Sequence, residues 1–260
     1  MNSEPYDQTL FDSLLNKKLI SRIHYFQSVD STNTFLRNLK NLQNFELALA
    51  ETQTSGRGRR GRVWKDEPFQ NLLFSFSYRS RDLTDTFTLI PLITALSIAK
   101  TCQLYLNHVE IKWPNDVKVN GKKISGILVE SKINVNESVF IIGVGLNINQ
   151  SEFDPEISEI STSFFLESEK KHNRGKILTE ILEQLIFNLN RLESNDLASL
   201  LAEYTSLCST VNKMISYDYQ NITETGFAVG IQKDGALLIE KNGTVTSYHG
   251  NEIFYIRSIS

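Results

Sequence analysis

The sequence predicts an α+β protein, with a mixed β-sheet flanked by helices and a small all-β unit after it. Apolar residues recur at helical spacing over 174–194, whereas 138–149 reads as a strong strand. From about Val211 the pattern changes to short strands separated by Lys-Asp-Gly, Lys-Asn-Gly and His-Gly-Asn turns, which is typical of a small β barrel. We therefore expect one domain over residues 1–208 and a second over 209–260.

After an opening helical piece, the chain is expected to form a strand, a helix and a second strand. The first strand covers 23–30, and Asp30, Ser31 or Thr32 is the N-cap of the next helix. The helical spacing runs through TFLRNLKNLQNF. The segment 45–53 then reads as a short buried strand that leads into a glycine- and arginine-rich loop.

The rest of the first domain alternates strands with long apolar helices. An Asn-Gly pair at 120–121 supplies the positive φ angles that a tight hairpin turn requires. A charged loop precedes the last two helices. The expected strands are 71–79, 109–113, the two arms of a hairpin over 117–131, and 138–149, and the expected helices are 86–106, 174–194 and 197–208.

Composition excludes several classes of protein. The net charge of −3 argues against a protein that coats nucleic acid. No apolar run is long enough to cross a membrane, and the N-terminus has no secretory signal pattern. Cys102 and Cys208 lie far apart in apolar segments without neighbours at metal-ligand spacing, so we expect two buried thiols in a reducing cytoplasm.

The stretch GRGRRGR at 56–62 concentrates positive charge on flexible backbone. It matches the dinucleotide-binding pattern GxGxxG, but that pattern works only when a helix follows, and VWKDEPFQNLLFSFS continues instead as a loop and a strand. A P-loop needs Lys-Ser or Lys-Thr after the last glycine, where Arg62 and Val63 stand. The stretch therefore belongs to neither class of nucleotide-binding loop.

Three interpretations of this arginine loop remain. It can be a solvated charge run or a nucleic-acid patch, although no second basic cluster of similar density exists. It can also be a loop whose backbone approaches an anion while its arginines surround it. A small ligand with a carboxylate and a triphosphate suits the third interpretation, because joining those groups needs cations where charge develops.

The motif KWPND places polar side chains at the end of a strand. Pro114 fixes the backbone there, and Asn115 and Asp116 follow at a position where ligands often bind. We expect Trp113 to be a packing residue. Asp116 either positions a cationic nucleophile or a metal-bound phosphate, or is an ordinary turn aspartate.

A lysine and three glycines mark the next strands. By strand alternation, Lys123 points to the same side as Ser125. Gly126 lies inside a strong strand, and Gly143 and Gly145 repeat this signal on a neighbouring one. Together the glycines predict a floor against which a flat apolar group can lie.

The motifs SVDSTNTFL, ETQTSGRGRRGRVW, KWPNDV, GKKISGILVES and GVGLNIN resemble those of biotin protein ligases in order and spacing. The closing GIQKDGALLIEKNGTVTSYHGNEIFYIR resembles their small C-terminal SH3-like domain. The resemblance implies the class II synthetase-like fold of biotin and lipoate ligases. It also implies a two-step reaction in which biotin and ATP give biotinyl-5′-AMP, and a lysine of a biotin carboxyl carrier protein then takes the biotinyl group.

The resemblance also assigns roles by position. Lys123, Arg59 and Asp116 match catalytic positions: contact with biotin's carboxylate and the α-phosphate, retention of the adenylate, and arrangement of the second step. The biotin-binding set is Ser31, Thr32, Asn33, Gln53, Arg57, Gly58, Arg59, Lys123 and Gly126. The ATP- and adenylate-binding set is Arg57, Arg59, Arg60, Arg62, Trp64, Asn115, Lys123 and Asn147. ATP chemistry implies Mg²⁺, for which no protein ligand is assigned.

Several further expectations follow from the resemblance. Ser31 stands too early for the DNA-binding domain that precedes this region in many bacterial relatives, so we expect a ligase that binds neither DNA nor membranes. Its acceptor is the carrier protein of a biotin-dependent carboxylase, and it can form a homodimer. The final strand departs from the family pattern around Arg257, whose role is therefore left open. The alternatives are a lipoate or octanoate ligase or transferase, and a basic-loop nucleic-acid binder.

Overall fold

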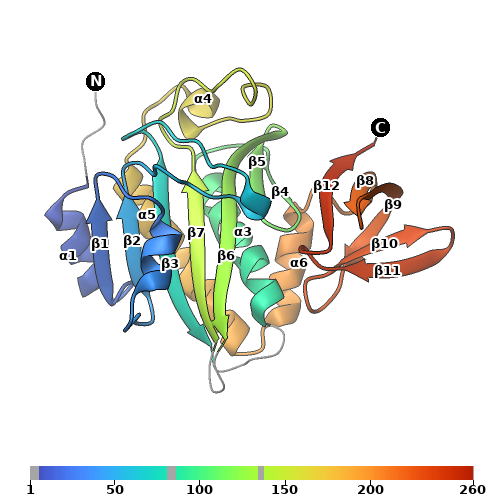
Figure 1. Ribbon diagram of the computed structural model, residues 1–260, viewed down its shortest axis with the longest axis horizontal. Coiled ribbons are helices and arrows are strands. Elements are labelled where there is room, and N and C mark those ends of the chain that lie inside the picture. Colours follow the sequence, from blue (N-terminus) through green and yellow to red (C-terminus); the bar gives the residue numbers. More distant parts are fainter. Residues whose placement is uncertain (1–5, 81–85, 134–137, 260) are drawn as a thin grey trace.

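Two β-sheets organise the chain in the computed structural model, which describes residues 6–80, 86–133 and 138–259. The first sheet has seven strands in the order β1-β2-β3-β7-β6-β5-β4 (Figure 1). Its strands are β1 (Arg22–Phe26), β2 (Glu46–Ala50), β3 (Leu72–Ser80), β4 (Val109–Lys112), β5 (Asp116–Val119), β6 (Lys122–Ile133) and β7 (Ser138–Leu146). β1 and β2 are parallel and the other pairs are antiparallel, so the sheet is mixed, as predicted.

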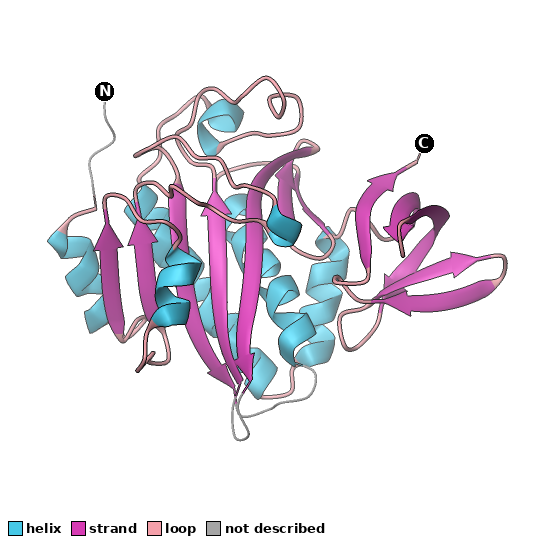
Figure 2. Cartoon of the chain, viewed as in Figure 1, coloured by secondary structure: helices cyan, strands magenta, loops and turns pink. Residues whose placement is uncertain are grey.

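Helices cover both faces of this sheet (Figure 2). They are α1 (Gln8–Asn16), α2 (Thr32–Asn38), α3 (Thr86–Gln103), α4 (Phe164–Ser168), α5 (Arg174–Glu193) and α6 (Leu197–Leu207). In the view of Figure 2, α3 and α5 lie behind the sheet and α2 lies in front. The apolar face predicted for α5 is buried. Because both faces are covered, β3 and β7 are buried along almost their whole length.

Two helices differ from the sequence prediction. α2 ends at Asn38, because Leu39 is extended with φ −65° and ψ 130°, so the helix is shorter than its apolar spacing indicates. α4 lies in the charged loop, where no helix was predicted, and Ser163 caps its first amides. Ser31 is the N-cap of α2, which selects one of the three predicted candidates.

The second sheet is antiparallel and has five strands in the order β11-β10-β9-β8-β12. Its strands are β8 (Lys213–Tyr219), β9 (Ile222–Ile231), β10 (Leu237–Lys241), β11 (Thr244–Tyr248) and β12 (Ile253–Ser258). It lies beside α6, next to the edge of the first sheet that β4 forms (Figure 1). One apolar cluster joins the two sheets, since Ile215, Leu237 and Ile253 belong to the same core as Trp113.

The predicted fold class is therefore confirmed: a mixed sheet with flanking helices, followed by a second, smaller β unit. No helix among the described residues is long and apolar enough to cross a membrane. Cys102 and Cys208 are buried free thiols, as expected, and burial raises the pKa of both.

Candidate active site

A cavity of about 730 Å³ lies between the first sheet and strand β12 of the second sheet. It is lined by all residues predicted for the site except Asn147: Ser31, Thr32, Asn33, Gln53, Arg57, Gly58, Arg59, Arg60, Arg62, Trp64, Asn115, Asp116, Lys123 and Gly126. These residues come from the start of α2, the arginine loop, the turn between β4 and β5, and β6. The fold thus brings the separate sequence motifs around one space.

One end of the cavity is neutral and closely hydrogen-bonded. The Gln53 side-chain oxygen accepts from the amide of Thr32 at 2.9 Å and from its hydroxyl at 3.1 Å. The Ser75 hydroxyl contacts Thr32 Oγ1 at 2.7 Å and Asn33 Oδ1 at 2.6 Å. Because Ser31, Thr32 and Asn33 are buried at the start of α2, this end offers fixed donors and acceptors to a small polar group.

The arginine loop is a short hairpin closed by its own backbone. Gly58 N donates to Arg62 O at 2.7 Å, and Trp64 N donates to Gly56 O at 2.9 Å. Arg60 has φ 57° and Gly61 has φ 72°, so two successive residues in the left-handed region reverse the chain. The sequence predicted flexible backbone here, and the structure shows how it turns.

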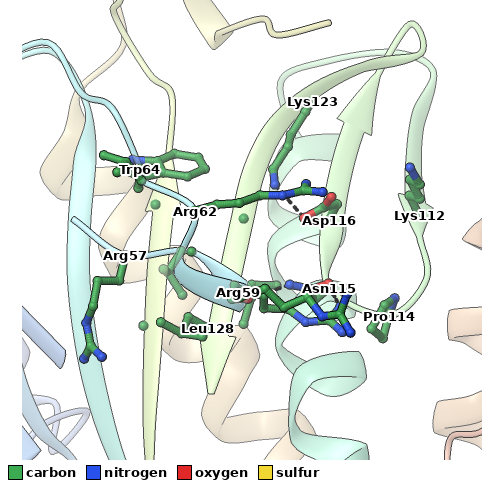
Figure 3. Close-up of a pocket in the computed structure, with 18 of the residues that line it drawn as sticks. Arg57, Arg59, Arg62, Trp64, Lys112, Pro114, Asn115, Asp116, Lys123 and Leu128 are labelled. Atoms are coloured by element: carbon green, nitrogen blue, oxygen red, sulfur yellow. Dashed lines mark hydrogen bonds and ion pairs between the residues drawn. The ribbon is translucent and has the colours of Figure 1, made fainter. Parts of the chain in front are cut away.

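The arginines of this loop are held by different partners (Figure 3). Arg57 points to the neutral side, where it donates to Thr34 Oγ1 at 3.2 Å and forms an ion pair with Glu130 at 3.0 Å. Arg59 donates to Asn115 Oδ1 at 2.8 Å and to the carbonyl of Gly250. Burial lowers the pKa of Arg59, and the neighbouring arginines lower it further against the opposing effect of Asp116.

At the other end of the cavity, Lys123 Nζ lies 2.7 Å from Asp116 Oδ1, and Arg62 extends towards this pair (Figure 3). Lys112 also lines this end, although the sequence analysis did not assign it to the site. Burial lowers the pKa of Lys112, and Lys118, Lys123 and Arg62 lower it further, while Asp116 opposes them. Positive charge therefore exceeds negative charge at this end.

The glycine floor exists, and a side chain of the protein lies on it. Gly126 and Gly145 are register partners on β6 and β7. A Cβ at Gly126 would meet the Trp64 ring at 2.9 Å, and one at Gly145 would overlap the same ring. The Asn33 amide occupies the space that a Cβ at Gly143 would need. The flat group predicted for the floor is therefore Trp64, whose buried indole nitrogen has no hydrogen-bond partner among the described residues.

The predicted orientation of Lys123 is wrong in one respect. Lys123 shares its side of the strand with Gly126, where a Cβ would lie 3.0 Å from Lys123 Nζ, rather than with Ser125. The register between β5 and β6 shifts, because Lys118 pairs with Lys123 while Val117 pairs with Ser125. This irregularity interrupts the alternation on which the prediction depended.

Asn147 is the predicted site residue that the structure does not bring to the cavity. It is buried, and its side-chain amide donates to Thr162 O at 3.0 Å. Conversely, Ile253, Phe254, Tyr255 and Ile256 of β12 line the cavity, although the sequence did not predict it. The strand carries no local signal for this role, because it reaches the cavity through the docking of the second sheet. Arg257, whose role was left open, lines the cavity as well.

The described residues that line the cavity offer few donor groups for a metal ion. Asp116 is the carboxylate among the described lining residues, and it is already paired with Lys123. No group of three His, Cys, Asp or Glu residues in the described ranges is placed to hold a metal ion. These residues do not fit a protein-held Mg²⁺.

Most of the residues that line the cavity lie in a segment that matches a known protein family. Residues 25–147 match the family described as the biotin/lipoate A/B protein ligase family. This segment contains every lining residue except Ile160 and those of β12. Residues 25–147 form a biotin/lipoate A/B protein ligase domain. The resemblance predicted from the motifs is therefore confirmed.

Similarity to known proteins extends beyond this ligase domain. The bifunctional ligase/repressor BirA of Escherichia coli is 28% identical over 228 residues, which cover 86% of this chain and 71% of that protein. The biotin–[acetyl-CoA-carboxylase] ligase of Mycobacterium tuberculosis is 27% identical over 217 residues, which cover 80% of this chain and 78% of that protein. The Aquifex aeolicus biotin protein ligase in complex with biotin and ATP superposes with a TM-score of 0.81 at 25% identity, covering 92% of this chain and 100% of that chain.

Proposed function

We propose that this protein is an ATP-dependent biotin ligase. It activates biotin to biotinyl-5′-AMP and transfers the biotinyl group to a lysine of a biotin carboxyl carrier protein. The observation that carries the proposal is a single cavity with a neutral hydrogen-bonding end and a cationic end. Biotin has a neutral polar head and a carboxylate, and ATP is polyanionic, so the two ends suit the two substrates.

In the first step, the neutral end orients biotin. Thr32, Asn33 and Gln53 offer donors and acceptors to the ureido head, which directs the carboxylate towards Lys123 and the arginine loop. A carboxylate oxygen attacks the α-phosphorus of ATP, a bond to that oxygen forms, and pyrophosphate leaves. Lys123 and Arg59 stabilise the negative charge that develops there, and the cavity holds the two reactants together.

In the second step, the amine of the acceptor lysine attacks the acyl carbon of the mixed anhydride, and AMP leaves. The attacking nitrogen releases a proton to solvent as the amide forms. Asp116 is the carboxylate at this end of the cavity and can accept a hydrogen bond from the incoming lysine, which places it for positioning this group. Arg59 retains the adenylate until the acceptor arrives, since its guanidinium is held at two points.

Mg²⁺ belongs to the substrate MgATP in this proposal, with phosphate oxygens and water as its ligands, and no step is assigned to it. We also propose that residues 1–208 form the catalytic domain and 209–260 the C-terminal domain. This division is supported by the end of α6 at Leu207 and the start of β8 at Lys213. Two free buried thiols are consistent with work in the cytoplasm.

The decisive experiment measures pyrophosphate release by the purified protein with MgATP and, separately, biotin, lipoate or octanoate. We expect release with biotin alone. Release with lipoate or octanoate instead would leave the fold assignment intact and contradict the proposal that biotin is the substrate. An absence of pyrophosphate release with all three acids would overturn the adenylation proposal. Incorporation of biotin into a purified carrier domain, compared with the same domain lacking its acceptor lysine, then tests the second step.

A further inference from the structure

Three successive parts of the arginine loop contact one short segment of the second sheet. Arg59 donates to the carbonyl of Gly250. The guanidinium of Arg60 lies over the ring of Phe254, and that of Arg62 lies 4.8 Å from the centroid of Tyr255. Segments that are 191 residues apart in the sequence are thereby joined across the mouth of the cavity.

Two adjacent residues of a regular strand point to opposite faces, so Phe254 and Tyr255 could not both face one loop. β12 is not regular at this point. Its pairing with β8 shifts between Phe254 and Arg257, and Tyr255 has φ 49°, in the left-handed region. Such a bulge re-aims side chains, and here both aromatic rings reach an arginine.

We infer that Phe254 and Tyr255 are positioning residues that hold the arginine loop against the cavity. A guanidinium over an aromatic face is attracted by the ring quadrupole. The loop supplies few apolar contacts of its own, since none of the residues of its single turn is buried. The aromatic pair therefore adds contacts with the second sheet to the polar contacts that Arg57 and Arg59 make with the first domain.

The consequence concerns the same loop as the proposed function and rests on it. A loop that is already held loses less conformational entropy when a ligand binds. The contacts are between groups of the chain itself, so we expect them to protect the loop both with and without biotin and ATP. Loss of either ring would shift the cost of ordering the loop to the substrates and raise their KM values.

The test is hydrogen–deuterium exchange of the full chain without ligand, followed by mass spectrometry of peptides that cover 56–64. In wild type, the hydrogen-bonded amides of Gly58, Arg62 and Trp64 should be protected. In the double variant Phe254→Leu/Tyr255→Leu, we expect these amides to exchange roughly fivefold to thirtyfold faster. Phe254→Tyr/Tyr255→Phe keeps both rings and should restore protection.

The control is Phe227→Leu, which removes a partly exposed aromatic ring of the same sheet that does not line the cavity. Loop exchange within twofold of wild type in the double leucine variant would overturn the inference. If that variant unfolds, Tyr255→Leu gives the same test, because this side chain is 50% exposed and its loss removes little packing. The exchange result does not use biotin or ATP, so it stands or falls separately from the pyrophosphate assay.

Discussion

The two ends of the cavity differ in the interactions that hold their side chains in place. At the neutral end, Thr32, Gln53 and Ser75 hydrogen-bond to one another and are fixed by the sheet and the start of α2. At the cationic end, Lys123 and Lys112 are half-buried, and Asp116 is the carboxylate that opposes them. The neutral end is satisfied by its own groups, whereas the cationic end carries a surplus of charge that an anion would relieve.

This difference indicates how the site combines selectivity with chemistry. Hydrogen-bonding groups in fixed positions favour a ligand whose donors and acceptors complement them, so the neutral end selects the head of the substrate. Cations that are already in position stabilise the negative charge that develops in the transition state, so the cationic end accelerates the reaction. Substitutions at the two ends should accordingly change different kinetic parameters.

The largest effect is expected from Lys123→Ala. Loss of this cation should lower kcat for biotin-dependent pyrophosphate release by roughly 10²–10³-fold, because it acts where charge develops. The control is Lys122→Ala, which removes the adjacent lysine that does not line the cavity. A rate for Lys123→Ala within tenfold of the control would remove the central assignment at the cationic end.

A smaller effect is expected from Arg59→Ala. Hydrogen bonds from charged donors are among the stronger ones, so biotinyl-AMP should dissociate roughly tenfold to a hundredfold faster. Released adenylate would then label lysines of a bystander protein, which streptavidin blotting detects. Arg22→Ala, at an exposed arginine, is the matched control. Labelling that stays confined to the acceptor would contradict the retention role.

At the neutral end, Thr32→Val keeps the shape of the side chain and removes its hydroxyl. The contacts of this hydroxyl with Gln53 and Ser75 are lost, so we expect the KM for biotin to rise roughly fivefold to thirtyfold with little change in kcat. Thr101→Val removes a buried hydroxyl that bonds within α3 and should leave this KM unchanged. If kcat falls and KM does not, the two ends do not divide the work as proposed.

The smallest effect is expected from Lys112→Met, and it separates charge from stability. Burial and neighbouring cations lower the pKa of Lys112, so its charged form destabilises the folded state at neutral pH. Methionine should therefore raise Tm by roughly 2–4 °C at pH 7 while raising the KM for ATP. Lys176→Met, at an exposed lysine, should change neither.

The pH dependence gives the sign of this effect. Between the lowered pKa of Lys112 and its ordinary value of 10.5, the unfolded chain binds more protons than the folded one. The stability contribution of wild-type Lys112 therefore improves as pH rises towards that value, and the advantage of Lys112→Met should shrink. Thermal melts of both proteins at pH 7 and pH 10 measure it. An advantage that grows with pH would contradict the buried-cation assignment.

Most of the fold and of the lining could be predicted because the signals are local. Asn120 and Gly121 adopt the positive φ angles that their turn requires, and Ser31 caps α2. Lys123 and the arginine loop reach the cavity because each motif follows a predictable strand. The family resemblance supplied the individual roles, and those remain proposals.

What the sequence could not predict depends on long-range packing. The aromatic pair of β12 reaches the arginine loop only through a bulge and through docking of the second sheet. Trp64 settles on the glycine floor because β6 and β7 place Gly126 opposite Gly145. Lys112 lies at the cavity because it is the register partner of Asp116 on the neighbouring strands β4 and β5. No pattern within a single segment encodes these distances.

The residues that line the cavity extend from Ser31 to Arg257, so its parts are synthesised at different times. The strands of the first sheet end at Leu146 and the helices that share its core end at Leu207, so the neutral end can form before β12 has been made. The part of the cationic end that β12 lines forms last, because β12 is the last strand of the second sheet to be synthesised. Nascent chains that have not reached residue 257 should thus contain the neutral end without a complete cavity.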